Sequence, residues 1–368
     1  MPYTTLLAIT TALLLSCLPF TTVSQLIEHE RVQKYHESNY TWPPSDDEFV
    51  PHTDGWRRLM QRRFEQVQRI ENSNDQYNGW VSTVHTALIC PNFTEYGWAL
   101  TRAPQPLIDD MLTSLKIGLN GGLDNLPVEH GSVDKVIDTP HRPLFHQQTE
   151  LNRRAMLQLH PIVEAWINNG KQRGSKGYIP LIANNAYGLR LYQNQSRLNM
   201  HVDKSETHIV SAIFHIDHDK DSKPWPLVIE DYHGNVNEVV LESGDVLLYE
   251  SSKCWHGRPI RFEGSWYTSL FIHYFPGNWK REQYENGVSK VHYRIPPNWN
   301  AVLPPRDDLE RLVMVETSAY EPECENTWCL LNDTKKWNVR GEYGKIVSGD
   351  EVVRDLHLIG RRRHGEEL

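Results

Sequence analysis

Two histidines and one aspartate stand out because their types match the ligands of a metal ion. His201-Val202-Asp203 places a histidine and a carboxylate two residues apart, and His256 follows in the run Trp255 to Pro259. Two histidines and one carboxylate hold non-haem Fe(II) on one face of an octahedron and leave the other positions open. Residues i and i+2 of a strand share a face, so His201 and Asp203 can reach one ion, with His256 arriving from a later strand. The pattern favours an oxygenase.

The elements that must position these residues are predicted from hydrophobic periodicity. Helical spacing predicts amphipathic helices over 56–70, 106–117 and 150–167, and Pro161 should kink or split the third. After residue 175, short runs rich in Ile, Val, Tyr and Phe lie between turn residues. They predict strands at 188–192, 207–216, 225–230, 236–241, 245–250 and 266–275. Such even spacing favours a sandwich or barrel, and a jelly roll fits best.

The predicted fold class is therefore α+β. A double-stranded β-helix (jelly roll) forms the core, with flanking N-terminal helices and an irregular C-terminal arm. We expect a signal peptide over 1–24, a helical lead-in over 25–84, the jelly-roll domain over 85–278 and a C-terminal extension over 279–368.

Residues from about 85 to 278 resemble the catalytic domain of the Fe(II)/2-oxoglutarate-dependent dioxygenases, most closely the prolyl 4-hydroxylase type. The run 187–192 before His201 is similar to that family's strand ahead of the metal ligands. The run 242–249 is similar to the turn and strand that lead to its second histidine. The resemblance implies a catalytic Fe(II) bound by His201, Asp203 and His256, and 2-oxoglutarate contacted by Tyr192. It further implies dependence on ascorbate and a protein or small-molecule substrate, such as a peptidyl proline.

One position departs from the family pattern. The family places Lys or Arg ten residues after the second histidine, where it pairs with the far carboxylate of 2-oxoglutarate, whereas this chain has Trp266. A dicarboxylate in a water-poor barrel needs a cationic partner to offset its desolvation. Arg258 and Arg190 are the candidates for this cofactor-binding role.

Two other interpretations stay open. His215-Ile216-Asp217 repeats the ligand spacing, but it falls where the family has its next strand, and no tyrosine lies nine residues before it. The chain could also be a catalytically inactive secreted protein that keeps the jelly roll for metal binding or as a matrix scaffold, and Trp266 is the main argument for this alternative.

Composition limits the partners. The 368 residues carry a formal charge of −9, and no block of like charges is longer than the Arg361-Arg362-Arg363 tail. This balance argues against nucleic acid as the main partner.

The termini and modification motifs point to the secretory pathway. Residues 6–20 are mostly apolar and too short to span a bilayer comfortably, which is typical of a cleaved signal, and no later apolar run reaches spanning length. We therefore expect a secreted protein or one of the endoplasmic reticulum lumen, where Gly365-Glu366-Glu367-Leu368 resembles a degraded retrieval signal. Acceptor sequons for N-glycans begin at Asn39, Asn92, Asn194 and Asn332.

Four cysteines remain after the predicted cleavage. Cys324 and Cys329 are close enough in sequence to close a small disulfide loop. Cys90 and Cys254 could pair or stay free.

Overall fold

The computed structural model describes residues 33–39, 49–69, 73–129, 137–280, 282–283, 294, 334–349 and 352–355. The predicted signal peptide, the predicted Cys324–Cys329 disulfide, the sequon at Asn332 and the C-terminal tetrapeptide lie outside these residues.

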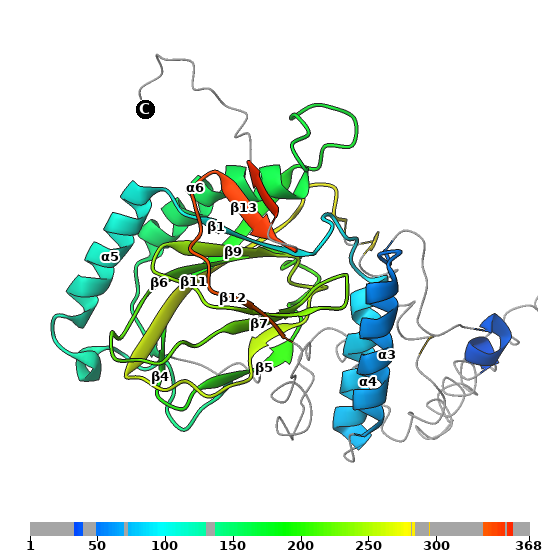
Figure 1. Ribbon diagram of the computed structural model, residues 1–368, viewed down its shortest axis with the longest axis horizontal. Helices are drawn as coiled ribbons and strands as arrows, with labels where there is room; N and C mark the ends of the chain where they lie inside the picture. Colours follow the sequence, from blue (N-terminus) through cyan, green and yellow to red (C-terminus); the bar gives the residue numbers. More distant parts are fainter. Residues whose placement is uncertain are drawn as a thin grey trace, which may run out of the picture.

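Two largely antiparallel sheets form the centre of the molecule (Figure 1). The eight-stranded sheet has the order β14-β13-β1-β9-β6-β11-β4-β3, and the six-stranded sheet has the order β12-β8-β7-β10-β5-β2. The strands of the first sheet are β1 (Trp98–Arg102), β3 (Leu144–Phe145), β4 (Leu181–Gln193), β6 (Val210–His218), β9 (Asp245–Tyr249), β11 (Trp266–Pro276), β13 (Lys345–Ser348) and β14 (Val352–Asp355). Those of the second are β2 (Ile137–Asp138), β5 (Arg197–His201), β7 (Leu227–Glu230), β8 (Val236–Val239), β10 (His256–Arg258) and β12 (Thr334–Trp337).

The predicted mixed class is confirmed, because helices flank the two sheets. The finer prediction of a jelly-roll winding stays a prediction. Each of the six predicted strands overlaps an observed one, and β4 and β11 are the longest, paired along most of their length.

The three predicted helices are present as α3 (Asp54–Gln68), α5 (Gln105–Leu119) and α6 (Thr149–Ile167). Pro161 does not split α6. The proline is exposed on the outer side of the helix, and the residue four before it, Leu157, is 50% exposed, so water can satisfy the carbonyl that loses its partner. The helix ends at Ile167 with Asn168 as its C-cap, followed by Asn169 and Gly170 with positive φ, a common way for a helix to stop.

A fourth helix, α4 (Ser73–Leu88), has no counterpart among the predicted elements. Residues 79–88 of this helix are all buried, so its sequence lacks the one-sided apolar stripe by which an amphipathic helix is detected. It packs beside α3, and Figure 1 shows the two helices together at one end of the sheets. A short 3-10 turn, η1 (Leu123–Asn125), follows α5.

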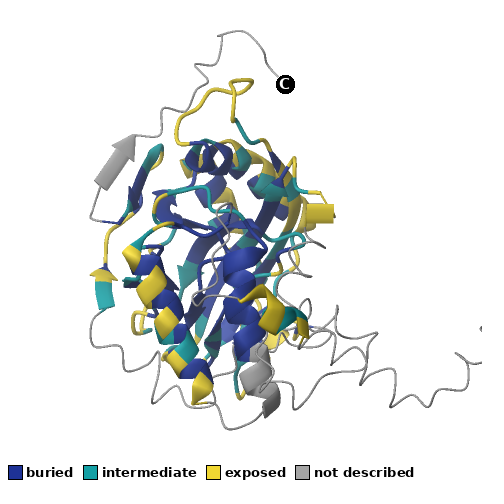
Figure 2. Cartoon of the chain, turned by 90° about the vertical axis from the view of Figure 1, so that its right-hand side faces the viewer, coloured by how far each residue is buried: buried dark blue, intermediate teal, exposed yellow. Residues whose placement is uncertain are grey.

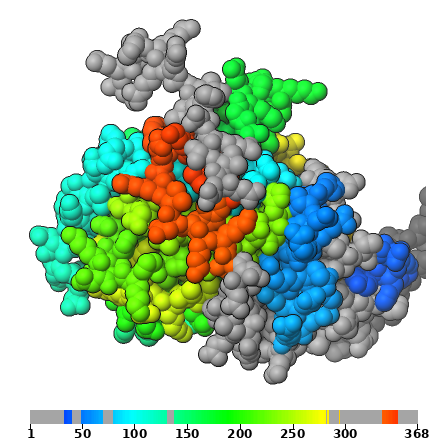
Figure 3. Space-filling view, viewed as in Figure 1, coloured from blue at the N-terminus to red at the C-terminus, as the bar shows by residue number. Residues whose placement is uncertain are grey.

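The described part of the C-terminal extension is not irregular, which corrects the predicted arm. β12 pairs in parallel with β8, and β13 pairs with β1, so residues 334–349 add a strand to each sheet. Figure 3 shows this segment, in orange, lying across the surface of the earlier strands. Thr334-Lys335-Lys336-Trp337 has no apolar alternation because it is an edge strand, where charged side chains face solvent.

The main core lies between the sheets and beneath the helices. Figure 2 shows the buried residues gathered in the strands and on the inner sides of the helices, with exposed residues on the outer helix faces. Trp56 of α3, Trp98 of β1 and Phe214 of β6 are among its largest fully buried side chains. Within the described ranges, no helix is both long and apolar enough to cross a membrane.

Candidate metal centre

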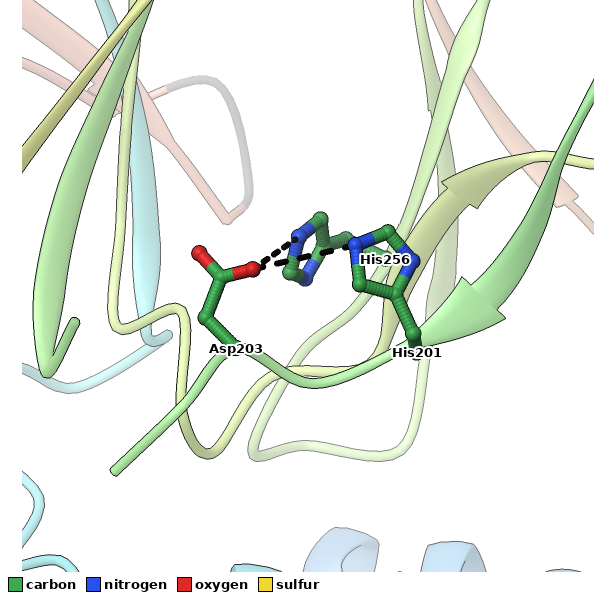
Figure 4. Close-up of side chains that lie close together, drawn as sticks. All are labelled: His201, Asp203 and His256. Atoms are coloured by element: carbon green, nitrogen blue, oxygen red, sulfur yellow. Dashed lines mark ion pairs between the residues drawn. The ribbon is translucent and has the colours of Figure 1, made fainter. Parts of the chain in front are cut away.

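The two histidines of the predicted ligand set lie opposite one another on neighbouring strands. His201 is the last residue of β5, and His256 is the first residue of β10. The antiparallel pairing puts these two residues in register, and their ring centroids are 4.3 Å apart (Figure 4). Pairing of β5 with β10 therefore brings together residues that the sequence separates by more than fifty positions.

Asp203 lies in the loop just after β5, not on the strand as its spacing predicted. Its backbone N–H donates to the carbonyl oxygen of Ser251 at 2.8 Å, which anchors the loop beside the segment that leads to β10. Oδ1 of Asp203 lies 3.7 Å from Nε2 of His201 and 3.7 Å from Nε2 of His256. The three ligand atoms all lie within 4.8 Å of one another.

Backbone carbonyls determine which ring nitrogen of each histidine faces Asp203 with a lone pair. Nδ1 of His201 lies 2.8 Å from the carbonyl oxygen of Asn199, and Nδ1 of His256 lies 2.9 Å from that of Cys254. A carbonyl only accepts hydrogen bonds, so each Nδ1 carries the proton and each Nε2 of the neutral ring is an acceptor. Two imidazole lone pairs and one carboxylate oxygen thus converge on one point, and a metal ion satisfies all three.

Burial keeps the site ready for a cation. It lowers the pKa of His256 to about 4, so this ring is neutral near pH 7 and can act as a ligand. Burial also raises the pKa of Asp203 from its ordinary value, since a carboxylate without a nearby positive charge is costly there. A bound divalent ion would remove that cost. The donor set of two nitrogens and one oxygen fits Fe(II).

Ser211 and His273 lie beside the other carboxylate oxygen, and sequence reasoning missed both. The Ser211 hydroxyl lies 3.5 Å from Oδ2 of Asp203, and Nδ1 of His273 lies 3.8 Å from the same oxygen. Ser211 and His273 are themselves 2.8 Å apart. Strand alternation within 266–275 puts His273 on the face of Tyr267, and this is the only sequence signal that could have found it.

The two arginines proposed to bind 2-oxoglutarate have different partners. Nε and Nη2 of Arg190 donate to the carboxylate of Glu129 at 2.9 and 2.7 Å. Nη1 of Arg190 lies 3.4 Å from the hydroxyl of Tyr192, which is also buried. Arg258 is buried against the rings of Trp225 and Tyr267 and makes no ion pair with any described residue. The cofactor-binding role of Tyr192, Arg190 and Arg258 stays a prediction.

Trp266, at the family's basic position, is the first residue of β11 and pairs with Gln193 of β4. Its neighbour Tyr267 contacts Arg258, so strand alternation turns Trp266 toward the opposite face of the sheet. Trp266 therefore does not take the place of a basic residue beside the metal centre.

The second copy of the motif does not form a metal cluster among the described residues. His215 lies on β6, with Nε2 2.9 Å from Nδ1 of His218 and its ring stacked on Tyr267 at 4.2 Å. Burial lowers its pKa well below the ordinary value. His215 is a core residue, and the ligand set at His201 is the one the structure brings together.

The remaining predicted sites fall on the surface or in the core. Cys90 and Cys254 are both buried and both free. Asn39 and Asn194 are exposed, and Asn92 is half-buried. Glycosylation at these positions stays a prediction.

Comparisons with known proteins find similarity only among solved structures. No protein-family profile and no curated protein matches the chain. A prolyl hydroxylase from Trichoplax adhaerens, in complex with a peptide of a hypoxia-inducible factor, is 12% identical with a TM-score of 0.36, covering 58% of this chain and 93% of that one. HygX from Streptomyces hygroscopicus, with nickel, 2-oxoglutarate and hygromycin B bound, is 14% identical with a TM-score of 0.35, covering 51% and 86%.

A prolyl 4-hydroxylase from Pseudomonas putida is 15% identical with a TM-score of 0.32, covering 49% of this chain and 92% of that one. Two of these structural neighbours are prolyl hydroxylases, and the third has nickel and 2-oxoglutarate bound. At these scores the similarity does not establish a shared fold, so the functional argument rests on the site.

Proposed function

We propose that the chain is an Fe(II)- and 2-oxoglutarate-dependent dioxygenase of the prolyl 4-hydroxylase-like kind. The observation that carries the proposal is the convergence of Nε2 of His201, Nε2 of His256 and Oδ1 of Asp203 within 4.8 Å of one another. Three protein ligands on one side of an ion leave the opposite positions for a co-substrate and O2. The same three residues carry the resemblance of the sequence to that family.

The chain's own residues have distinct parts in this proposal. His201 and His256 are fixed by the carbonyl oxygens of Asn199 and Cys254, which direct both lone pairs at the ion. The Ser211 hydroxyl donates to Oδ2 of Asp203, and His273 lies next to the same oxygen, so Oδ1 is the oxygen that faces the ion. When bound, Fe(II) would allow O2 to oxidise both 2-oxoglutarate, giving succinate and CO2, and the substrate, and ascorbate would keep the iron reduced.

The substrate and the location are a further part of the proposal. The predicted signal and sequons support the endoplasmic reticulum lumen or secretion. In that compartment a peptidyl proline of a secreted protein is the substrate that the family resemblance favours.

One assay tests the activity. The purified chain is loaded with Fe(II) and 2-oxoglutarate without oxygen, then exposed to O2, and succinate is measured against a His201→Ala control. We expect succinate from the wild type and none above background from the variant. Metal binding without any succinate, with or without a proline-rich peptide, would contradict the oxygenase. It would support the alternative of an inactive metal-binding protein, for which Trp266 is the main argument.

A further inference from the structure

Arg258 is a buried cation that makes no contact with a carboxylate in the part of the chain that the structure describes. Its side chain is 3% exposed. One guanidinium nitrogen donates to the carbonyl oxygen of Trp225, and Nη2 donates to the hydroxyl of Tyr267 at 2.9 Å. Both acceptors are neutral. A buried charge with only neutral partners is costly, so this position calls for an anion.

The surroundings of Arg258 exclude water and restrict the movement of its guanidinium group. The group lies 4.7 Å from the ring centre of Trp225 and 4.5 Å from that of Tyr267. These two rings belong to a buried aromatic cluster with Tyr192 and Phe262. The two rings stand nearly perpendicular to one another, at 83°, and a guanidinium group packed against both is preorganised to bind a carboxylate.

The Tyr267 hydroxyl adds a second donor. Its oxygen accepts from Arg258, and the hydroxyl proton has no acceptor among the described residues. A carboxylate placed beside Arg258 can therefore receive hydrogen bonds from both side chains.

Arg190, the other candidate, has its charge already compensated. Its two bonds to the carboxylate of Glu129 form a bidentate pair in which both side chains are buried. An incoming carboxylate would have to displace Glu129 and leave it buried without its partner, which is strongly unfavourable.

The position of Arg258 relative to the metal ligands fits a short bifunctional acid. His256 and Arg258 are two residues apart on β10, roughly 6.8 Å along a strand. The pairing of β10 with β5 is irregular between them, so their directions are given by their contacts. Both reach the eight-stranded sheet: the ring of His256 lies against Tyr249 of β9, and Arg258 contacts Tyr267 of β11. The metal ligand and the arginine thus point into the same space between the two sheets.

We propose that Arg258 and the hydroxyl of Tyr267 bind the far carboxylate of a dicarboxylic 2-oxo acid whose 2-oxo acid end lies at the metal centre. This inference rests on the proposed function and deepens it, because the chain uses a residue of β10 where the family uses the position occupied here by Trp266. The site should therefore discriminate strongly between dicarboxylic and monocarboxylic 2-oxo acids.

The test compares two ligands of equal chain length that differ in the far carboxylate. 2-Oxoglutarate and 2-oxopentanoate are titrated calorimetrically, without oxygen, into the Co(II)-loaded full chain. Wild type is expected to prefer 2-oxoglutarate by roughly 10- to 100-fold, the effect of one charge-assisted pair. Arg258→Gln should reduce this preference to about twofold or less. Arg190→Gln and the matched control Arg261→Gln, whose exposed side chain pairs with Asp138, should keep it.

The outcomes distinguish a failure of the carboxylate-binding role of Arg258 from a failure of the proposed function. If the wild type binds both acids equally, or if Arg258→Gln keeps the full preference, Arg258 does not bind the far carboxylate. Either result overturns this inference and does not contradict the proposed oxygenase function. A Co(II)-loaded wild type that binds neither acid overturns both proposals. If Arg258→Gln fails to bind Co(II) or to fold, Arg258→Lys takes its place. Lysine keeps the charge but not the planar fork, so a lower preference supports the assignment and an unchanged one overturns it.

Discussion

Asp203 is the residue on which the metal centre depends most, because each of its oxygens has a separate task. Oδ1 faces the two histidine Nε2 atoms, and Oδ2 faces Ser211 and His273. The residue stands in a loop, so nothing in a strand ladder fixes its side chain. The contacts to Oδ2 position the side chain instead. The backbone N–H of Asp203 donates to the carbonyl oxygen of Ser251, whose hydroxyl is hydrogen-bonded to Ser211.

This argument predicts the effect of removing His273. His273→Ala should lower the affinity for Co(II) by about 10- to 100-fold, the range found when partners of metal ligands are removed, while the fold is kept. Calorimetric titration of the metal measures the change, with the exposed His141→Ala as control. Equal affinities in His273→Ala and wild type would show that Asp203 needs no such support.

Helix α3 connects the N-terminal region to the strand that carries His256. Nη2 of the buried Arg63 donates to the carboxylate of Glu230 at 2.8 Å, at the end of β7, and the guanidinium group stacks on Trp255 at 4.6 Å. Trp255 directly precedes His256. The predicted lead-in is thus packed against the segment that enters the metal centre.

Replacing Arg63 should therefore destabilise the whole chain. Arg63→Ala leaves Glu230 buried with a weaker set of partners, and we expect a loss of about 3 kcal/mol in the free energy of unfolding. Arg57→Ala, an exposed change on the same helix, should stay within about 0.5 kcal/mol of wild type. Denaturant unfolding of the two variants decides the point, and similar losses in both would mean that α3 is not anchored through Arg63.

At the scale of the molecule, the C-terminal segment joins the two sheets. Nε1 of Trp337 donates to Oδ1 of Asn237 on β8, and its ring packs on Trp98 of β1. The N–H of Gly341 donates to Oδ1 of Asp245 at 2.9 Å, which lies at the start of β9. Residues 334–349 are therefore part of the packed structure, not an appended arm.

Asp245 gives this junction a pH dependence. Burial raises the pKa of Asp245 from 3.8 to about 6 in the folded chain. The folded state keeps this proton to higher pH than the unfolded state, so its stabilising contribution is full below about pH 4 and is lost as pH rises through about 6. The free energy of unfolding of wild type relative to Asp245→Asn should fall across that interval. Urea unfolding at pH 4.5 and 7 measures it, and a difference that rises or stays constant would contradict the shift.

The sequence predicted the parts of the structure in which local pattern and packing agree. The six predicted strands follow from alternating and β-branched residues, and α3, α5 and α6 from one-sided apolar stripes. The short strands β5 and β10, which carry His201 and His256, were not among the predicted strand ranges. Helix α4 was missed because its second half is buried on all sides, and β12 because an edge strand such as Thr334–Trp337 needs no apolar alternation.

At the site, too, the ligands were predicted from the sequence but their supporting contacts were not. The types and spacing of the ligands sufficed to predict His201, Asp203 and His256 as one set. The sequence could not show which arginine has its charge compensated by a carboxylate. Arg190 is paired with Glu129, which lies 61 positions away in the chain. The support of Asp203 by His273 likewise depends on how β11 packs beside β6.

The most direct test of the account is the stoichiometry and location of metal binding. Fe(II) or Co(II) is titrated anaerobically into wild type, His256→Ala and His215→Ala. We predict one ion per chain in wild type and in His215→Ala, which changes only the second copy of the motif, and at least a hundredfold weaker binding in His256→Ala, because two of three ligands do not hold the ion. Undiminished binding in His256→Ala, or loss of binding in a folded His215→Ala, would contradict the assignment of the metal centre.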